Sequence, residues 1–87
     1  MSNLLFLTQA WDDYLYWQEY DRRMAKRINQ LIQDAMRNPF TGIGKPEPLK
    51  NKWSGWWSRR IDDTHRLVYK AEKDLLVIAA CRTRYGN

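Results

Sequence analysis

Apolar residues form a short continuous run near the start of the chain and then recur at helical spacing. The run, residues 4–7, is typical of a short buried strand. Thr8 follows it and offers an N-cap hydroxyl for a first helix that continues through Trp17. Asp12 and Asp13 fall in the early turns of this helix, where negative charge complements the helix dipole. The pattern therefore predicts a strand followed directly by an amphipathic helix.

A second stretch shows a more regular helical stripe. Asp21 is suited to cap it, and apolar side chains then recur at helical intervals, at Met24, Ile28, Leu31, Ile32 and Ala35. The dipeptide Asn38-Pro39 ends the helix, because a residue that precedes proline avoids the α conformation. Residues 39–48 contain three prolines and two glycines and are predicted to form a loop.

In the C-terminal half the pattern becomes that of strands. Residues 53–61 carry aromatic and then basic side chains, and residues 65–70 alternate. Residues 75–82 are apolar almost throughout, as expected of a central strand that is covered on both faces. We therefore interpret the whole chain, residues 1–87, as one α+β domain in the order β-α-α-β-β-β. Its two N-terminal helices are expected to pack on a mainly antiparallel sheet.

Composition narrows the classes of protein to which the chain can belong. Hydrophobic residues at 44% and charged residues at 29% are typical of a globular domain and not of a disordered chain. The single cysteine, Cys81, argues against a disulfide framework or a multi-cysteine metal site, and its apolar strand predicts a buried, inert thiol. The start of the chain does not resemble a signal peptide, and no apolar stretch approaches the roughly 20 residues of a membrane span. We therefore expect a cytoplasmic protein without a membrane partner.

The net charge of +5 is concentrated in one segment of the chain and in the tail. Between residues 37 and 60 a single acid, Glu47, stands among six basic residues: Arg37, Lys45, Lys50, Lys52, Arg59 and Arg60. Arg82 and Arg84 add positive charge near the end. A cluster of this kind indicates a polyanion such as RNA as partner, although a merely solubilising surface would have the same composition.

The side chains available for catalysis exclude several chemistries. One histidine and one cysteine do not make a zinc or iron site, and no glycine-rich phosphate loop is present. His65 is expected to begin a strand and to have a structural role. RNA cleavage remains compatible, because RNA supplies its own 2′-OH nucleophile and needs from the protein a base and positive charge at the phosphate. Glu47, between Pro46 and Pro48, is the candidate base, with a solvated loop glutamate as the alternative.

Several motifs, in order along nearly the whole chain, give it a family resemblance. They are Trp11-Asp12-Asp13-Tyr14-Leu15-Tyr16-Trp17-Gln18, Lys45-Pro46-Glu47-Pro48-Leu49-Lys50, Ser54-Gly55-Trp56-Trp57-Ser58-Arg59-Arg60-Ile61, His65-Arg66-Leu67-Val68-Tyr69, Ala79-Ala80-Cys81-Arg82 and Tyr85. On these residues the chain resembles the YoeB (Txe) toxins of the RelE superfamily, which belong to bacterial type II toxin–antitoxin systems.

The resemblance implies a RelE-like α+β fold and a metal-independent endoribonuclease that needs no cofactor. Its substrate would be mRNA in the A site of the 70S ribosome, and its other partners a YefM-like antitoxin and a second copy in a homodimer. Glu47 would be the general base, Arg66 would bind the scissile phosphate, and Tyr85 would orient the substrate. The RNA backbone would be bound by Lys45, Lys50, Lys52, Arg59 and Arg60.

The tail departs from the family pattern at one position. Where the family commonly has Arg-x-His-Tyr, with histidine as the general acid, this chain has Arg84 in the place of the histidine. Arginine stays protonated far above neutral pH, so Arg84 would either stabilise the leaving oxygen by its charge or donate a proton late, once that oxygen becomes strongly basic. A toxin-like protein that binds RNA, the ribosome or its antitoxin without cleaving is therefore an alternative. A gyrase-poisoning toxin of the ParE branch is disfavoured by the combination of Glu47, Arg66 and Tyr85.

Alternation along the predicted strands assigns some of these residues to faces. Arg59 and Arg60 should point to opposite faces, so only one of them should lie at the scissile region. At least one tryptophan of the pair Trp56-Trp57 should be part of the core for the same reason. Arg66 should share a face with Val68 and Lys70, opposite Leu67 and Tyr69.

Overall fold

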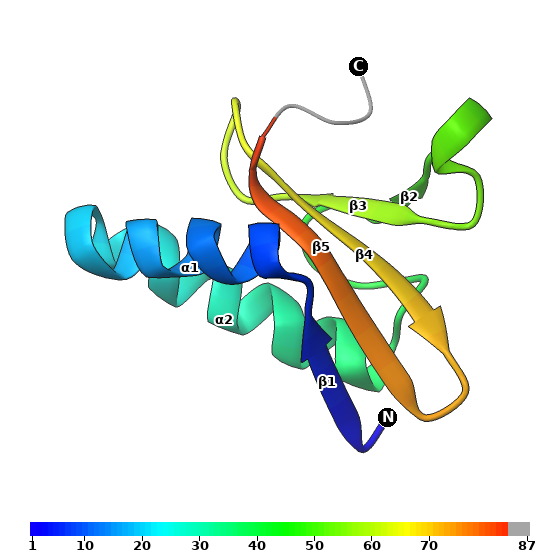
Figure 1. Cartoon of the computed structure of the whole chain (residues 1–87). Helices are drawn as coiled ribbons and strands as arrows, with labels where there is room; N and C mark the ends of the chain where they lie inside the picture. Colours follow the sequence, from blue (N-terminus) through cyan, green and yellow to red (C-terminus); the bar gives the residue numbers. More distant parts are fainter. Residues whose placement is uncertain (84–87) are drawn as a thin grey trace.

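The computed structural model describes residues 1–83, in which two helices cover one face of a five-stranded sheet (Figure 1). The elements are β1 (Asn3–Phe6), α1 (Thr8–Tyr20), α2 (Arg22–Arg37), β2 (Glu47–Pro48), a 3-10 turn η1 (Asn51–Trp53), β3 (Trp57–Arg60), β4 (Arg66–Glu72) and β5 (Leu75–Thr83). The strand order is β1-β5-β4-β3-β2, in which β1 runs parallel to β5 and the other pairs are antiparallel. The predicted α+β architecture is confirmed.

The main core lies between the helices and the sheet. The predicted stripe of α2 is buried there at Ile28, Leu31, Ile32 and Ala35, against Leu67, Tyr69, Leu76 and Ile78 of β4 and β5. Each large apolar side chain buried in this way stabilises the fold by about 1.5–3 kcal/mol. Asp21 caps α2 as predicted, since its carboxylate accepts hydrogen bonds from the backbone N–H groups of Arg23 and Met24.

A second, smaller cluster lies on the face of the sheet opposite the helices. It consists of Leu49, Val68, Ala79 and Ala80, with Trp53 and Trp56 packed against it. Trp57 packs instead against the main core, so the prediction that the two neighbouring tryptophans lie on opposite sides is confirmed. The chain between β2 and β3 therefore folds over the open face of the sheet.

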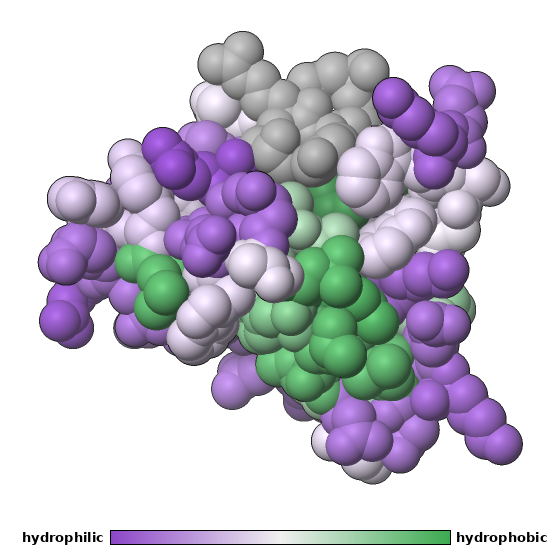
Figure 2. Space-filling view, viewed as in Figure 1, coloured by the Kyte–Doolittle hydropathy of each residue, from purple (hydrophilic) through white to green (hydrophobic). Residues whose placement is uncertain are grey.

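Two predictions about the N-terminal region are wrong. The apolar run 4–7 is not buried, because β1 is an edge strand, and Leu4, Leu5 and Leu7 are each more than 40% exposed. These residues contribute to the apolar patch that Figure 2 shows over β1. Thr8 is the first residue of α1 and not its cap; Leu7 occupies the cap position, and no side chain caps the helix.

The predicted strand 53–61 is also too long, since β3 covers only residues 57–60. Residues 51–53 form η1 instead, and Gly55 adopts a φ of +94°, which favours glycine. The predicted loop 39–48 contains a two-residue strand at its end, where Glu47 pairs with Ser58 and Pro48 with Trp57. The pairing of Glu47 and Pro48 with β3 therefore sets the short strand at the end of the loop.

Asp13 has a different role from the one its helical position predicts. Its side chain is only 4% exposed and accepts hydrogen bonds from the side chain of Gln9 and from the backbone N–H of Cys81. One turn later Trp17 donates to the carbonyl of Cys81. The register of β5 against β4 shifts at this point, and α1 supplies partners for the backbone groups of the irregular position.

Candidate active site

A carboxylate and a guanidinium meet on the face of the sheet opposite the helices. Nη1 of Arg66 lies 3.0 Å from Oε1 of Glu47, and the Glu47 side chain is half exposed. Glu47 pairs with Ser58 on β3, and Arg66 pairs with Arg60 two positions further along the same strand. Because directly paired residues share a face, Glu47, Arg60 and Arg66 all lie on this side of β3 and β4. An exposed ion pair adds only about 0–1 kcal/mol to stability, so its geometry is of interest mainly for chemistry.

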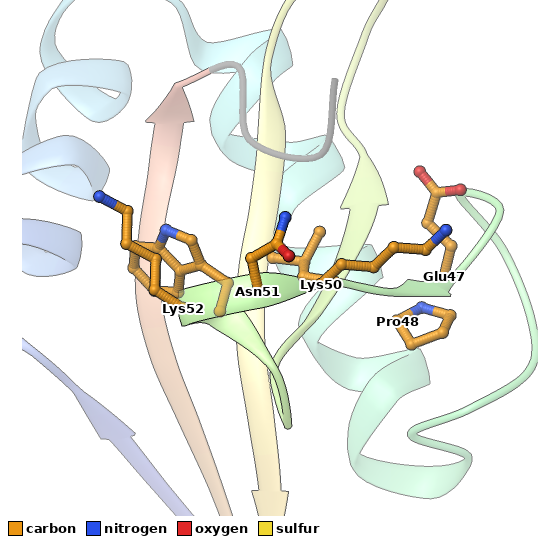
Figure 3. Close-up of a pocket in the computed structure, with 7 residues that line it drawn as sticks. Glu47, Pro48, Lys50, Asn51 and Lys52 are labelled. Atoms are coloured by element: carbon orange, nitrogen blue, oxygen red, sulfur yellow. The ribbon is translucent and has the colours of Figure 1, made fainter.

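A pocket of about 500 Å³ adjoins this pair (Figure 3). It is lined by one continuous segment, Glu47 to Trp53, with the apolar Leu49 and Trp53 beside the polar side chains. In Figure 3 the side chain of Lys50 extends toward Glu47, whereas that of Lys52 extends the other way. The pocket thus combines an acid, two cations and apolar surface, which suits a ligand with phosphate groups and flat bases.

Four of the five predicted RNA-binding residues are on the surface. The side chains of Lys45, Lys50, Lys52 and Arg60 are exposed, and Lys45 has a positive φ of 52°. Arg60 is paired with Arg66 and lies on the same face as Glu47. Positive charge therefore lies near both members of the Glu47–Arg66 pair, from Lys50 beside Glu47 and Arg60 beside Arg66, as a polyanion would require.

The structure contradicts the prediction that the fifth residue, Arg59, binds RNA. Its side chain is fully buried on the helix side of the sheet and forms an ion pair with Asp34 at 2.6 Å. All five N–H groups of its guanidinium donate to acceptors within the protein. No donor is left for a phosphate, so Arg59 does not belong to an RNA-binding surface. The prediction that Arg59 and Arg60 lie on opposite faces is confirmed.

Other assignments to faces also agree with the structure. Leu67 and Tyr69 are in the main core and Val68 is in the opposite cluster, as alternation predicts. Lys70, which sequence reasoning did not select, lies with its ammonium 5.7 Å from the centre of the Trp56 ring. The sequence could have pointed to Lys70, because strand alternation places it on the same face as Arg66. Lys70 therefore adds a further cation to the open face.

His65 and Cys81 are packed away from the open face that carries this pair. The ring of His65 packs edge-on against Trp17 on the helix side, with ring centres 4.9 Å apart, in agreement with a structural role. Cys81 is fully buried, and burial raises the pKa of its thiol to about 12, as expected of an inert thiol. Among residues 1–83 no group of three His, Cys, Asp or Glu side chains is placed to hold a metal ion. Nor is any helix of this part long and apolar enough to cross a membrane.

Two predicted catalytic residues, Arg84 and Tyr85, lie outside the described residues. The last described residue of β5, Thr83, pairs with Arg66. The described chain therefore ends on the strand position beside the candidate phosphate-binding arginine.

Comparison with known proteins identifies the family. The family described as the YoeB-like toxin of bacterial type II toxin–antitoxin systems matches residues 6–85. Toxin YoeB of Escherichia coli K12 is 60% identical over 82 residues, which cover 94% of this chain and 98% of that protein. A YoeB/ParE toxin from Agrobacterium tumefaciens superposes with a TM-score of 0.93 at 47% identity, covering 95% of this chain and 99% of the other.

Two structures of a Staphylococcus aureus relative add information about assembly. YoeB of that organism, solved as a dimer, has a TM-score of 0.90 at 45% identity and covers 95% of this chain and 97% of its own. Its heterotetrameric complex with YefM has a TM-score of 0.89 at 44% identity, with 98% and 99% of the two chains covered. On the family match, the high identities and the shared fold, this chain belongs to the YoeB-like toxins of bacterial type II toxin–antitoxin systems.

Proposed function

We propose that this toxin is an endoribonuclease that cleaves mRNA in the A site of the 70S ribosome and so inhibits translation. The observation that carries the proposal is the Glu47–Arg66 pair at 3.0 Å on an open, basic face beside a pocket. In the reaction Glu47 takes the proton from a 2′-OH, whose oxygen attacks the adjacent phosphorus. Arg66 turns its N–H groups to the phosphate and neutralises the charge that develops there.

The remaining candidate residues complete the reaction. Departure of the 5′-oxygen creates negative charge, which Arg84 stabilises because its guanidinium remains cationic at neutral pH. Tyr85 orients the substrate next to it. Lys45, Lys50, Lys52 and Arg60 bind the RNA backbone. No metal or other cofactor takes part in this scheme.

The partners follow from the family and the surface. We expect a YefM-like antitoxin to neutralise the toxin by covering the Glu47 face, and YoeB of Staphylococcus aureus does form a complex with YefM. The same relative forms a dimer, so a homodimer is expected here as well. The ribosome and its mRNA would place the protein in the cytoplasm.

The test is cleavage of a defined message on purified ribosomes, with the new RNA ends mapped. Glu47→Gln should lower the rate of cleavage by about 10²–10⁴-fold, the usual contribution of a general base. Glu72→Gln removes an exposed acid at the far end of β4 and should leave the rate unchanged. An intact message at every concentration of the wild-type protein would contradict the proposal.

A second candidate function is binding without cleavage, and Arg84 is the observation that favours it. Without the family's tail histidine the protein would occupy the ribosome or bind its antitoxin but leave the message intact. Arg84→His and Arg84→Ala should be assayed side by side with the wild type. An inactive wild type together with an active Arg84→His variant would select the binding function.

A further inference from the structure

The loop that brings Glu47 to the site, residues 38–46, is bonded from the helix side of the sheet by one buried arginine. Nη1 of Arg59 donates to Asp34 at 2.6 Å and to the carbonyl of Ile43 at 3.1 Å. Nη2 donates to the carbonyls of Asn38 at 2.6 Å and Thr41 at 2.9 Å. Nε donates to the hydroxyl of Tyr69 at 2.9 Å. A single side chain thus bonds to three positions of the loop.

Further hydrogen bonds hold the same loop. The hydroxyl of Tyr69 donates to the carbonyl of Pro39 at 2.6 Å, and Asp34 accepts from the backbone N–H of Ile43 at 2.9 Å. The backbone N–H of Arg60 donates to the carbonyl of Gly44 at 2.7 Å. We call Arg59, Asp34 and Tyr69 the Arg59 cluster. Its bonds begin where α2 ends, and Gly44, the last bonded position of the loop, lies three residues before Glu47.

The loop also packs closely against α2, and this packing limits the backbone conformations that the loop can adopt. Gly44 has a φ of +81°, and a Cβ there would lie 2.7 Å from Cδ2 of Leu31. Gly42 has a φ of +121°, and a Cβ there would overlap with Oδ2 of Asp34. Only glycine combines this backbone conformation with this proximity. The path of the loop is therefore set by packing as well as by hydrogen bonds.

Strand β3 connects the cluster with the candidate active site. Arg59 points to the helices, whereas its neighbours in the strand serve the other face. Ser58 is the pairing partner of Glu47, and Arg60 both pairs with Arg66 and bonds Gly44. A displacement of Arg59 would therefore also move Ser58 and Arg60, its neighbours in the strand. Because Ser58 pairs with Glu47 and Arg60 pairs with Arg66, the distance between Glu47 and Arg66 would change.

Stability alone is a weak reason for this arrangement. Burial of an ion pair costs desolvation, and well-packed apolar residues of similar volume are often as stabilising or more so. The polar groups of the cluster nevertheless have hydrogen-bond partners. The hydrogen bond from Arg59 holds the pKa of Asp34 below its usual value. Burial raises the pKa of Tyr69 and keeps its hydroxyl protonated. Such a network defines one geometry for the segments that it joins.

We propose that Arg59, Asp34 and Tyr69 are positioning residues for the cleavage reaction, because they hold the loop so that Glu47 stands beside Arg66. This inference rests on the proposed function of Glu47 as the base. It assigns to a group buried on the helix side of the sheet a role in the alignment of catalytic groups on the other side.

The sharpest variant is Tyr69→Phe, which keeps the ring and removes two hydrogen bonds of the cluster. At a temperature where the variant is fully folded, we expect kcat for cleavage of ribosome-bound message to fall about tenfold, since small misplacements of catalytic groups have large effects. The KM for programmed ribosomes should change less than about twofold, because the RNA-binding cations are untouched. The matched control is Tyr14→Phe, which removes a tyrosine hydroxyl bonded to Asn29 between the helices and should leave kcat unchanged.

A double-mutant cycle separates positioning from general destabilisation. In a Glu47→Gln background Tyr69→Phe should cause no further loss of kcat, because the group that it positions no longer acts. An unchanged kcat for Tyr69→Phe alone, or a full tenfold loss in the Glu47→Gln background, would overturn the proposal. Asp34→Asn is the second variant if Tyr69→Phe does not fold, and the same outcomes apply.

A readout that does not depend on activity keeps this inference distinct from the proposed function. The amide of Arg60, bonded to Gly44, should exchange its hydrogen about tenfold faster in Tyr69→Phe than in the wild type, because the loop opens locally. The amides of α1 should keep their protection. If the wild type does not cleave RNA, the proposed function fails, while faster exchange at Arg60 still supports the positioning of the loop. Unchanged exchange at Arg60 would refute that positioning in either case.

Discussion

Residues 1–83 contain two arginine–carboxylate pairs, one on each face of the sheet. The two pairs consist of the same kinds of charged group, but they differ in exposure and in their hydrogen bonds within the protein. Arg59 and Asp34 are 0% and 19% exposed, and every N–H of Arg59 is bonded within the protein. Arg66 and Glu47 are 14% and 50% exposed, and the pair stands beside a pocket. The first pair organises the loop, whereas the second retains access to a ligand. Burial and the number of internal acceptors, not the pairing itself, distinguish an arginine that is fully bonded within the protein from one that can still bind a ligand.

The largest expected effect is on stability, and it compares two consecutive arginines. Arg59→Ala should destabilise the fold by about 3–5 kcal/mol, because it removes a fully buried side chain and leaves the Asp34 carboxylate and the carbonyls of Asn38 and Thr41 without their donor. Arg60→Ala should change the free energy of unfolding by less than about 0.5 kcal/mol, since its side chain is exposed. Urea denaturation of both variants measures this difference. Equal losses would show that the two faces are energetically alike.

A smaller change at the open face should affect activity and leave the fold intact. Arg66→Lys keeps the positive charge but loses the paired donors of the guanidinium, so single-turnover cleavage should slow by about 10²-fold. The midpoint of urea unfolding should stay within the error of the wild type. A stability loss as large as that of Arg59→Ala would mean that the exposed pair is structural after all.

The cations around the pocket should affect binding more weakly than Arg66 affects catalysis. In the inactive Glu47→Gln background, Lys50→Ala should reduce affinity for ribosomal RNA at low salt and lower the slope of log K against log salt by about one. Lys73→Ala, in the turn between β4 and β5, is the control and should keep the slope. Affinity that does not vary with salt would contradict the basic surface.

The smallest effect is expected in acid and concerns only the buried pair. Because the hydrogen bond from Arg59, together with that from the backbone of Ile43, lowers the pKa of Asp34, the stabilisation is present above the unfolded pKa of about 3.9 and is lost as pH falls toward the folded value. Arg37 and Tyr69 also lie near this carboxylate. Asp34→Asn should therefore flatten the loss of stability below pH 4 in denaturation curves measured at several pH values. Asp12→Asn, at an exposed position of α1, should leave that acid dependence as in the wild type.

The local pattern of the second helix predicted its structure well, whereas the local cap predicted at Thr8 did not form. The stripe from Met24 to Ala35, the cap at Asp21 and the break before Pro39 depend on neighbours within one or two turns, and α2 forms as predicted. The pattern of apolar and polar residues at 53–61 was less regular than that of the second helix, and the extent of β3 was predicted wrongly. The difference follows from the origin of the stabilisation, since strands take theirs from partners that are distant in sequence.

The amino-acid sequence by itself determined the fold class and the family and named Glu47 and Arg66 as candidates, because periodicity and motifs are properties of the chain; only the structure showed that the two side chains form a pair. Alternation also predicted that Arg59 and Arg60 face opposite ways. Only the tertiary structure decided which of them is buried, because the face covered by helices depends on how β3, α2 and β4 come together. The burial of Arg59 against Asp34, and of Asp13 against Cys81, likewise required contacts between residues 25 and 68 positions apart.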